Sequence, residues 1–377
     1  MAERSERQSN IELLRIIAAL GVVLLHYNNP RLGSGFANVA NMSVNQFVMI
    51  LFEAVFICAV NLFVLISGYF MRNTSKRDLL KPVQLLSMYV VFELLAYLIK
   101  ELPKGEPFSI ASFAGYFTPS YWFVFIYIAL YLLSPYINLM WLHLSRKGQK
   151  QLLIILVALF SIYPIIWEIV AYVSGTSIWA EELICSYGLM QGTSSIGLFG
   201  SGAGYTIVNF VLMYLIGCYI KGSEDEGRKY KSSTLFILLV VNIALIIGWT
   251  YLEFFITGQP INATTGWNYE SPLVISEAVL FFLLFKNMKM KNNKVINILA
   301  AASFPTYLIH INLLEYIKIG QFVQGNTLLL ILHITGSMII IYLISFAIFE
   351  LYDLITRPVF RSISQKWKRR RFIDISK

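Results

Sequence analysis

The sequence is poor in charged residues, and this shortage excludes the commonest classes of protein. Only 14% of the 377 residues are Asp, Glu, Lys or Arg, while 57% are hydrophobic. Soluble domains carry about 25% charged and about 45–50% apolar residues, so an average soluble enzyme is excluded. Disorder is excluded as well, because it requires low hydrophobicity and high net charge. The composition therefore favours a chain whose surface is largely covered by lipid.

Cysteine and histidine are also scarce. The three cysteines are odd in number and form no C-x-x-C pair, so they define neither a disulfide framework nor a zinc site. The four histidines are His26, His143, His310 and His333. Metal chemistry would have to use very few ligands, and we expect no metal.

Ten apolar segments have a length suited to crossing a membrane, which takes about 20 mostly apolar residues. They lie at roughly 11–28, 46–71, 82–100, 120–142, 151–173, 205–221, 234–256, 272–286, 295–317 and 327–352. The eighth is short, and Pro305 interrupts the ninth. The first contains Glu12 and Arg15 and lacks a small-residue cleavage site, so we expect it to be retained rather than removed as a signal peptide. We predict an all-α integral membrane bundle of about ten transmembrane helices.

The distribution of Lys and Arg predicts the orientation, because cytoplasmic loops carry the excess of these residues. With a cytoplasmic N-terminus, 25 of the 30 basic residues fall in inside segments, four fall outside, and Arg15 lies within a span. Both termini are then cytoplasmic. The net charge of +9 is accounted for by topology, so we expect no nucleic-acid partner.

We expect one membrane domain at 1–356, followed by a basic cytoplasmic tail at 357–377 that faces anionic membrane lipid. The longest outer loop, about 174–204, is rich in Gly and Ser. It lacks the strand–helix setting of a nucleotide-binding fingerprint, and we interpret it as a loop.

Two ionisable residues lie eleven positions apart in the first span. At about 100° per residue, Arg15 and His26 project from one face, with an axial separation of about 16 Å. Ionisable groups inside a membrane usually face a cavity or the bundle interior. Each also has a simpler explanation, since Arg15 could pair with Glu12 at the inner interface and His26 could be an interfacial histidine. Their shared face favours a functional role.

A second histidine lies at a similar predicted depth in the ninth span. Ser303, Tyr307 and His310 share one helical face, and His310 falls in the outer half of the membrane. Histidines at one depth on two helices suggest a shared cavity. For His143 and His333 we prefer a structural role.

The second and fourth spans carry further candidates. The second ends in Ser67-Gly68-Tyr69, and Gly68 allows close helix approach. The basic residues that follow are a topology signal that could also bind the phosphates of an anionic cofactor: Arg72, Lys76, Arg77 and Lys81. The fourth span opens with Tyr121-Trp122-Phe123, which an aromatic belt at the interface also explains.

These segments, in this order, resemble the acyltransferase-3 family of integral membrane acyltransferases, and the likeness covers essentially the whole chain. The motifs that carry it are Arg15-x10-His26 within N-I-E-L-L-R-I-I-A-A-L, F-x-x-x-S-G-Y at 63–69, Y-W-F at 121–123, Tyr214-Leu-Ile-Gly217, and S-x-x-x-Y-x-x-H at 303–310. The run after Tyr69 is thinner in arginine than in many members, with Lys81 where an arginine is common.

The resemblance implies transfer of an acyl group, often acetyl, from cytoplasmic acetyl-CoA or another acyl-CoA to a hydroxyl or amine of a cell-surface glycan or lipid-linked sugar, in a bacterial cytoplasmic membrane. It implies donor contacts from Arg15, Ser67, Gly68, Arg72, Arg77 and Lys81, and acceptor contacts from Tyr121 and Trp122. In this interpretation His26 is the general base or acyl carrier, and His310 with Tyr307 orients the acceptor or stabilises the oxyanion.

Two other functions remain open at the level of the sequence. A transporter for a sugar intermediate or amino acid would also suit a polar cavity with an inner basic mouth. A non-catalytic membrane partner in glycan assembly is the third possibility.

Overall fold

The structure, a computed structural model, describes residues 7–105, 107–117, 121–174, 204–367 and 372–374. The first group of helices is α1 (Ser9–Asn28), α2 (Gly35–Asn38), α3 (Val44–Phe56), α4 (Ala59–Met71), α5 (Leu80–Glu101), α6 (Ile110–Tyr116), α7 (Trp122–His143), α8 (Arg146–Val157) and α9 (Tyr163–Ser174). The second group is α12 (Ile207–Asp225), α13 (Ser232–Thr257), α14 (Pro272–Lys286), α15 (Lys294–Leu299), α16 (Ser303–Leu314), α17 (Gly320–Val323) and α18 (Thr327–Trp367).

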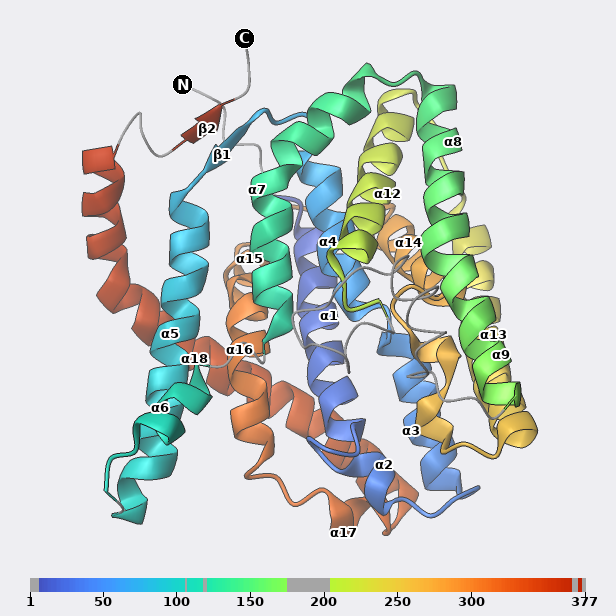
Figure 1. The fold of residues 1–377 in the computed structure, drawn as a ribbon, viewed down its shortest axis with the longest axis vertical. Coiled ribbons are helices and arrows are strands. Elements are labelled where there is room, and N and C mark those ends of the chain that lie inside the picture. The colour runs from blue at the N-terminus through green and yellow to red at the C-terminus, as the bar shows by residue number, and fades with distance from the viewer. Residues whose placement is uncertain (1–6, 106, 118–120, 175–203, 368–371, 375–377) are drawn as a thin grey trace.

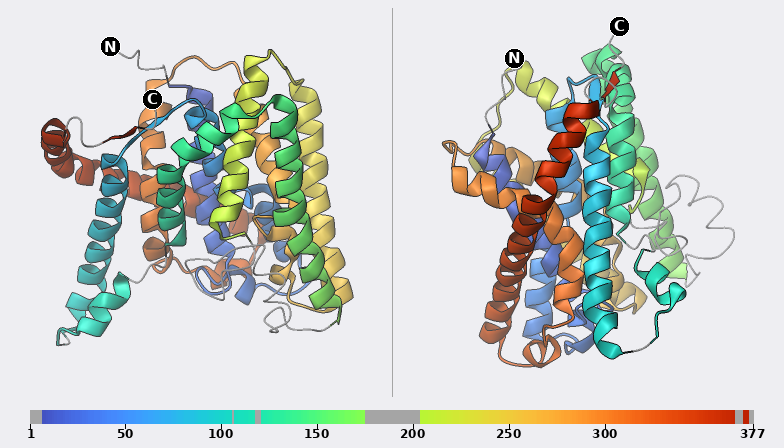
Figure 2. Two further views of the ribbon diagram at one scale, coloured as in Figure 1. Left: turned by 45° about the horizontal axis from the view of Figure 1, so that its top comes forward. Right: turned by 90° about the vertical axis from the view of Figure 1, so that its left-hand side faces the viewer.

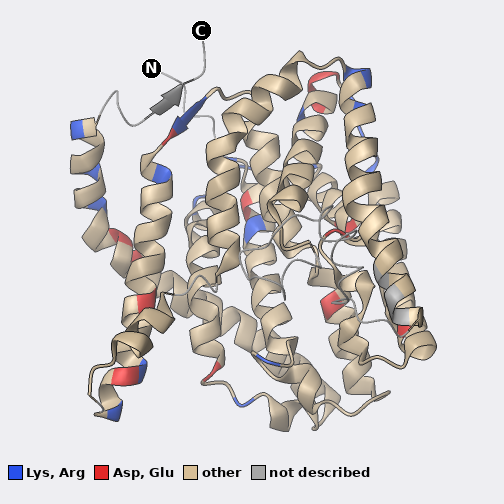
Figure 3. Ribbon diagram, viewed as in Figure 1, with Lys and Arg blue, Asp and Glu red and all other residues tan. Residues whose placement is uncertain are grey.

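These helices form one bundle with the N- and C-termini at the same end (Figure 1), which we call the terminal end. Within the described residues, ten helical stretches are long and apolar enough to cross a membrane, so the predicted all-α membrane bundle is confirmed. Charged residues gather mainly toward the two ends of the bundle, and most of its middle is uncharged (Figure 3).

The bundle has a protein-buried centre and a lipid-facing periphery. Within the most apolar window, 61% of α1 and 72% of α3–α4 are buried inside the protein, against 28% of α13 and 33% of α18. Large apolar side chains such as Ile237, Leu252 and Leu332 are exposed on the peripheral helices, where lipid tails would cover them. Functional side chains on α1 and α4 therefore lie inside the bundle.

Three of the predicted spans are not regular α-helices. The second is broken between α3 and α4 at Ile57–Cys58, and the fifth contains a π-helical turn at Ala158–Ile162. The ninth contains a 3₁₀ turn at Ala300–Ala302 directly before α16. Pro305 then lies in the first turn of α16, where its missing N–H costs no helical hydrogen bond. The interruption expected from Pro305 is therefore found just before it.

The last helix is much longer than the predicted span. α18 has 41 residues, or about 60 Å, which is twice the hydrocarbon thickness of a bilayer. It passes the expected boundary at 356/357 and runs beside α5 (Figure 2). Beyond it, β2 (Phe372–Asp374) pairs antiparallel with β1 (Lys76–Asp78). Residues 357–367 are thus a helical continuation of the membrane domain.

Candidate active site

The structure brings the two predicted histidines into direct contact. His26 lies near the end of α1 and His310 in the middle of α16, and Nδ1 of His26 meets Nε2 of His310. Their ring centroids are 4.6 Å apart and the ring planes differ by 14°. His310 is fully buried, while His26 is partly exposed. The shared depth inferred from the two sequence segments is therefore confirmed.

The hydrogen bonds of this pair determine which nitrogen is free. Nδ1 of His310 is 2.9 Å from the carbonyl oxygen of Thr306, which only accepts, so Nδ1 of His310 donates. In the neutral ring Nε2 of His310 is then an acceptor, and it takes its hydrogen bond from Nδ1–H of His26. This assignment leaves Nε2 of His26 with a free lone pair, as a general base or nucleophile needs.

A cavity of about 1040 Å³ lies at the terminal end, between α1, α4, α5, α7, α16 and α18. Its basic residues outnumber its acidic ones, so the lining is net cationic. The basic residues are Arg7, Arg15, Lys81, Arg357 and Arg361, and the acidic ones are Glu12, Asp78 and Asp353. Hydroxyl groups of Ser67, Tyr127, Tyr131 and Ser303 also line it. Such a lining suits an anionic ligand with several hydrogen-bonding groups.

A small apolar pocket of about 30 Å³ lies deeper than this cavity and shares four lining residues with it: Phe63, Phe123, Ser303 and Phe304. Its other three lining residues are Val22, Val60 and Tyr307. Val22 is one helical turn before His26, and the Tyr307 ring is 6.0 Å from the His310 ring. The two spaces therefore lie in series between the terminal end and the histidine pair.

Arg15 combines the local ion pair considered from the sequence with a position on the cavity lining. Its side chain is about one third exposed, lines the large cavity, and forms an ion pair with Glu12 at 3.1 Å. Its guanidinium carbon also lies 5.9 Å from the centre of the Phe70 ring. Arg15 thus marks the cavity side of α1, and His26 lies about 16 Å further along the helix.

Ser67 and Gly68, neighbours in the sequence, have different roles. Ser67 lines the cavity, donates to the carbonyl of Phe63 at 2.8 Å and lies 3.2 Å from the Tyr127 hydroxyl. Gly68 does not line the cavity; a Cβ added there would lie 2.0 Å from the carbonyl oxygen of Tyr214 on α12. Gly68 therefore permits the close crossing of α4 and α12, as the packing interpretation expects.

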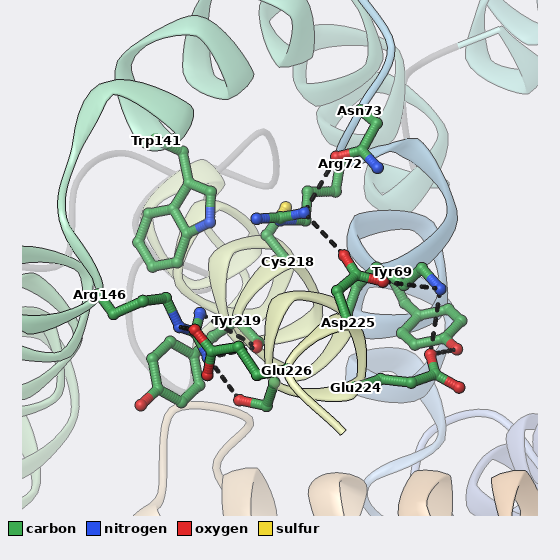
Figure 4. Close-up of polar contacts among 12 residues, drawn as sticks. Tyr69, Arg72, Asn73, Trp141, Arg146, Cys218, Tyr219, Glu224, Asp225 and Glu226 are labelled. Atoms are coloured by element: carbon green, nitrogen blue, oxygen red, sulfur yellow. Dashed lines mark hydrogen bonds and ion pairs between the residues drawn. The ribbon is translucent and has the colours of Figure 1, made fainter. Parts of the chain in front are cut away.

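Arg72 is placed away from the cavity, at the end of α12. Its guanidinium pairs with Asp225 at 3.1 Å (Figure 4). Neighbouring ion pairs join Lys221 and Lys286 to Glu224. The Tyr69 hydroxyl also donates to Glu224. The acidic end of α12 thus uses Arg72 in a cluster that ties α4 to α12, which leaves its predicted cofactor role without support from the geometry.

Arg77 is likewise a structural group. It is only 3% exposed, and its Nε donates to the Ser134 hydroxyl of α7 at 2.6 Å. Its other nitrogens donate to the carbonyls of Lys76, at 2.9 Å, and of Thr74 and Met71. With its donors directed at the protein, Arg77 fixes the turn before α5. Lys81, by contrast, is exposed and lines the cavity, as predicted.

The predicted acceptor residues lie in an aromatic layer that includes Tyr307. The Tyr121 ring contacts Tyr307 at 5.7 Å, and its hydroxyl is 3.4 Å from Nδ2 of Asn312. Trp122 packs against Tyr205 at 4.6 Å and is 8% exposed. Burial raises the pKa of the Tyr205 hydroxyl, so it stays protonated. Tyr121 is linked to the site through Tyr307, while Trp122 is a packing residue here.

The two remaining histidines have local partners, as expected. Nδ1 of His143 is 2.7 Å from the carbonyl of Leu139, and His333 bonds to the Tyr27 hydroxyl and stacks on Phe322. The predicted outer loop at 174–204 lies almost entirely outside the described residues.

Sequence analysis missed the contribution of α18 to the cavity. Arg357 and Arg361 line it together with Asp353 and Gln365, and these four residues recur every fourth position on one helical stripe. That spacing is visible in the sequence. The basic composition after residue 356 instead predicts a tail, and this prediction hides the stripe.

Comparison with known proteins agrees with this architecture. A family model described as an acyltransferase domain matches residues 8–350, which include the histidine pair and every transmembrane helix except the last turns of α18. Comparisons with curated proteins and with solved structures gave no match. With most of its length matched, the chain belongs to the acyltransferase-3 family and is a multi-pass membrane acyltransferase.

Proposed function

We propose that the protein transfers an acyl group, acetyl in the simplest case, from cytoplasmic acyl-CoA to a hydroxyl of a cell-surface polysaccharide or lipid-linked sugar. The observation that carries this proposal is the order of the groups: a cationic cavity, an apolar pocket, and then a histidine with a free ring nitrogen. A thioester donor has the same order, with an anionic end, a long arm and a reactive carbonyl.

The hydrogen-bond donors that line the cavity suit the anionic end of an acyl-CoA. The guanidinium of Arg15 and the ammonium of Lys81 offer charged hydrogen bonds to phosphate oxygens, and the hydroxyl of Tyr127 offers a neutral one. The arm would lie in the large cavity, and the apolar pocket beside Tyr307, at about 30 Å³, would receive only the acyl end of the donor. Water is scarce in such a pocket, which strengthens electrostatic interactions at the reacting carbonyl.

In this mechanism Nε2 of His26 takes the proton of the acceptor hydroxyl as its oxygen attacks the thioester carbonyl carbon. The carbon–sulfur bond then breaks, and the thiolate leaves as CoA thiol after receiving that proton from His26. The alternative is attack by Nε2 itself, with a transient acyl-histidine that the hydroxyl resolves. His310 positions His26 in both routes, because its Nδ1–H bond to Thr306 dictates the tautomer of the pair.

The test compares His26→Ala, His310→Ala and a control, His333→Ala, in protein that inserts normally. We expect His26→Ala to lower acyl transfer by about 10²–10⁴-fold, the usual range for a general acid–base group. His310→Ala should cause a smaller fall, and His333→Ala little change. The assays are CoA-thiol release with acceptor present and mass spectrometry of the envelope glycan. Retained acylation in His26→Ala would refute the mechanism, and a transporter would release no thiol.

The proposed location is the bacterial cytoplasmic membrane with both termini in the cytoplasm. Its support is the excess of basic residues in alternating loops. Single cysteines at Lys104 and Lys147, in a cysteine-free background, test it by labelling of intact cells with an impermeant maleimide. Lys104→Cys should react and Lys147→Cys should not, and the opposite pattern contradicts the orientation.

A further inference from the structure

One wall of the cationic cavity is built from residues beyond the family match. The match ends at residue 350, whereas α18 continues to Trp367. We call the cavity-lining part of this continuation the α18 wall: Asp353, Arg357, Phe360, Arg361, Ser364 and Gln365. The family likeness therefore says nothing about this wall, and its role has to be argued from its own side chains.

The α18 wall carries cations that differ in their pairing. Arg357 forms an ion pair with Asp353 one turn earlier on the same helix. Arg361 is exposed, and the structure records no ion pair for it with any residue between Arg7 and Trp367 that it describes. Lys81, on the facing helix α5, is exposed and likewise forms no ion pair with a residue in the described part of the chain. Arg361 and Lys81 thus face one space from separate helices. Their combined positive charge favours the binding of an anion that carries two or more negative charges.

The wall is held in place from both sides. Before it, the Tyr352 hydroxyl donates to Ser87 of α5 at 3.1 Å, and beyond it β2 pairs with β1. Asp78 of β1 also lines the cavity. These contacts make the α18 wall a fixed side of the cavity rather than a free helix end, so its guanidinium groups are presented at defined positions.

We propose that the α18 wall binds the phosphate groups of the donor, with Arg361 as the principal contact and Lys81 opposite it. This inference rests on the proposed function, since it names the residues that hold the donor's anionic end. Arginine suits the task because its planar guanidinium binds phosphate oxygens in pairs. When the thioester lies in the pocket beside Tyr307, the phosphates of the same molecule lie toward the terminal end, where the α18 wall stands.

A lipid headgroup offers the same phosphate chemistry. A second cavity of about 720 Å³ shares Arg357 and Asp353 with the first and adds Lys294 and Glu350. Arg361 lines only the larger cavity. Binding at Arg361 therefore separates the two sources: a donor in the large cavity depends on it, and a headgroup in the second cavity does not.

The experiment measures binding of CoA and of pantetheine, which lacks the nucleotide and its phosphates, to purified full-length protein in phosphatidylcholine nanodiscs. The variants are Arg361→Ala, Arg361→Lys and a matched control, Lys366→Ala, which removes a cation from the same helix outside the cavity. We expect Arg361→Ala to weaken CoA binding about 10-fold and to leave pantetheine binding unchanged. Arg361→Lys should retain part of the affinity, and Lys366→Ala should bind as the wild type does.

The outcomes separate this inference from the proposed function. If the wild type binds CoA and Arg361→Ala binds it equally well, the α18 wall does not hold the donor, and the proposed function stands. If the wild type binds no CoA, both fail. If the wild type and Arg361→Ala bind CoA equally and phosphatidylglycerol in the nanodiscs weakens that binding equally in both, the phosphate site is a lipid-headgroup site in the second cavity, and the inference is overturned. Arg361 is exposed, so monodisperse elution of each variant is expected and confirms folding.

Discussion

The substitution Gly68→Ala tests whether Gly68 is a packing residue or a contact for the acyl donor. The Cβ of alanine would lie 2.0 Å from the carbonyl oxygen of Tyr214, whereas real Cβ atoms essentially never approach closer than 3.0 Å. α4 and α12 would have to move apart by at least 1.0 Å at this point. A Cβ added at Gly217 would likewise lie 2.2 Å from the Leu65 carbonyl oxygen, so neither backbone has room to yield.

The size of the effect follows from this displacement. A gap of 0.5–1 Å already forfeits a quarter to a half of the dispersion energy of the atoms that face it. Overpacking in a well-packed core typically costs 1–3 kcal/mol, and here the obstacle is backbone rather than a flexible side chain. We therefore expect Gly68→Ala to destabilise the protein by about 3 kcal/mol or more, and to lower its apparent melting temperature by roughly 4 °C or more.

The assay is thermal unfolding of detergent-purified protein, followed by loss of monodisperse elution, with CoA affinity measured on the same samples. The matched control is Gly248→Ala on α13, where an added Cβ meets nothing within 4 Å. That variant should be neutral or slightly stabilised, because alanine favours a helix over glycine. If Gly68→Ala melts like the wild type but binds CoA more weakly, Gly68 contacts the donor and the packing argument is refuted.

Two further substitutions test contacts that join separate segments of the fold. Arg77→Ala should lower the free energy of unfolding by about 3 kcal/mol or more, because it removes the hydrogen-bond donor of the buried Ser134 hydroxyl and of the Lys76 carbonyl. If the variant melts like the wild type but has a raised KM for acyl-CoA, Arg77 contacts the acyl donor instead. The Glu253 carboxylate accepts a hydrogen bond from the Thr265 N–H at 2.7 Å. Glu253→Gln should therefore lower the melting temperature and speed hydrogen exchange of the Thr265 amide, and an unaltered exchange rate would contradict this role.

The helical periodicity of the sequence correctly predicted the central pair of the site. Apolar spacing placed Arg15 and His26 on one face, and the direction of the ninth span put His310 at the same depth. What it did not provide was the bond between the rings, because that bond joins helices 284 residues apart. The bond from His310 to the Thr306 carbonyl is local, one turn away within α16, but it fixes the tautomer of the pair only once the two rings meet. The local sequence pattern indicates how deep a residue lies along its span and which helix face it occupies. Tertiary packing determines which side chains contact each other.

The basic cluster after Tyr69 shows the limit of such patterns. The sequence suggested one phosphate-binding group, but the structure divides it: Lys81 faces the cavity, Arg77 binds backbone and Ser134, and Arg72 pairs with Asp225. The acid that engages Arg72 lies 153 residues away in the chain. No local feature marks which cation has such a partner. The stripe on α18, by contrast, was readable from its four-residue spacing.

The partners of α1 also bear on how the protein is made. His310 follows His26 by 284 residues, and the carbonyls that receive the Asn10 side chain follow it by 275 and 276. At about 5–20 residues synthesised per second, α1 waits roughly 15–60 s in the membrane for these contacts. During that time the one charged partner of Arg15 that α1 itself supplies is Glu12, three residues away. The Glu12–Arg15 pair thus lowers the cost of holding an unassembled helix in lipid, long before it borders a cavity.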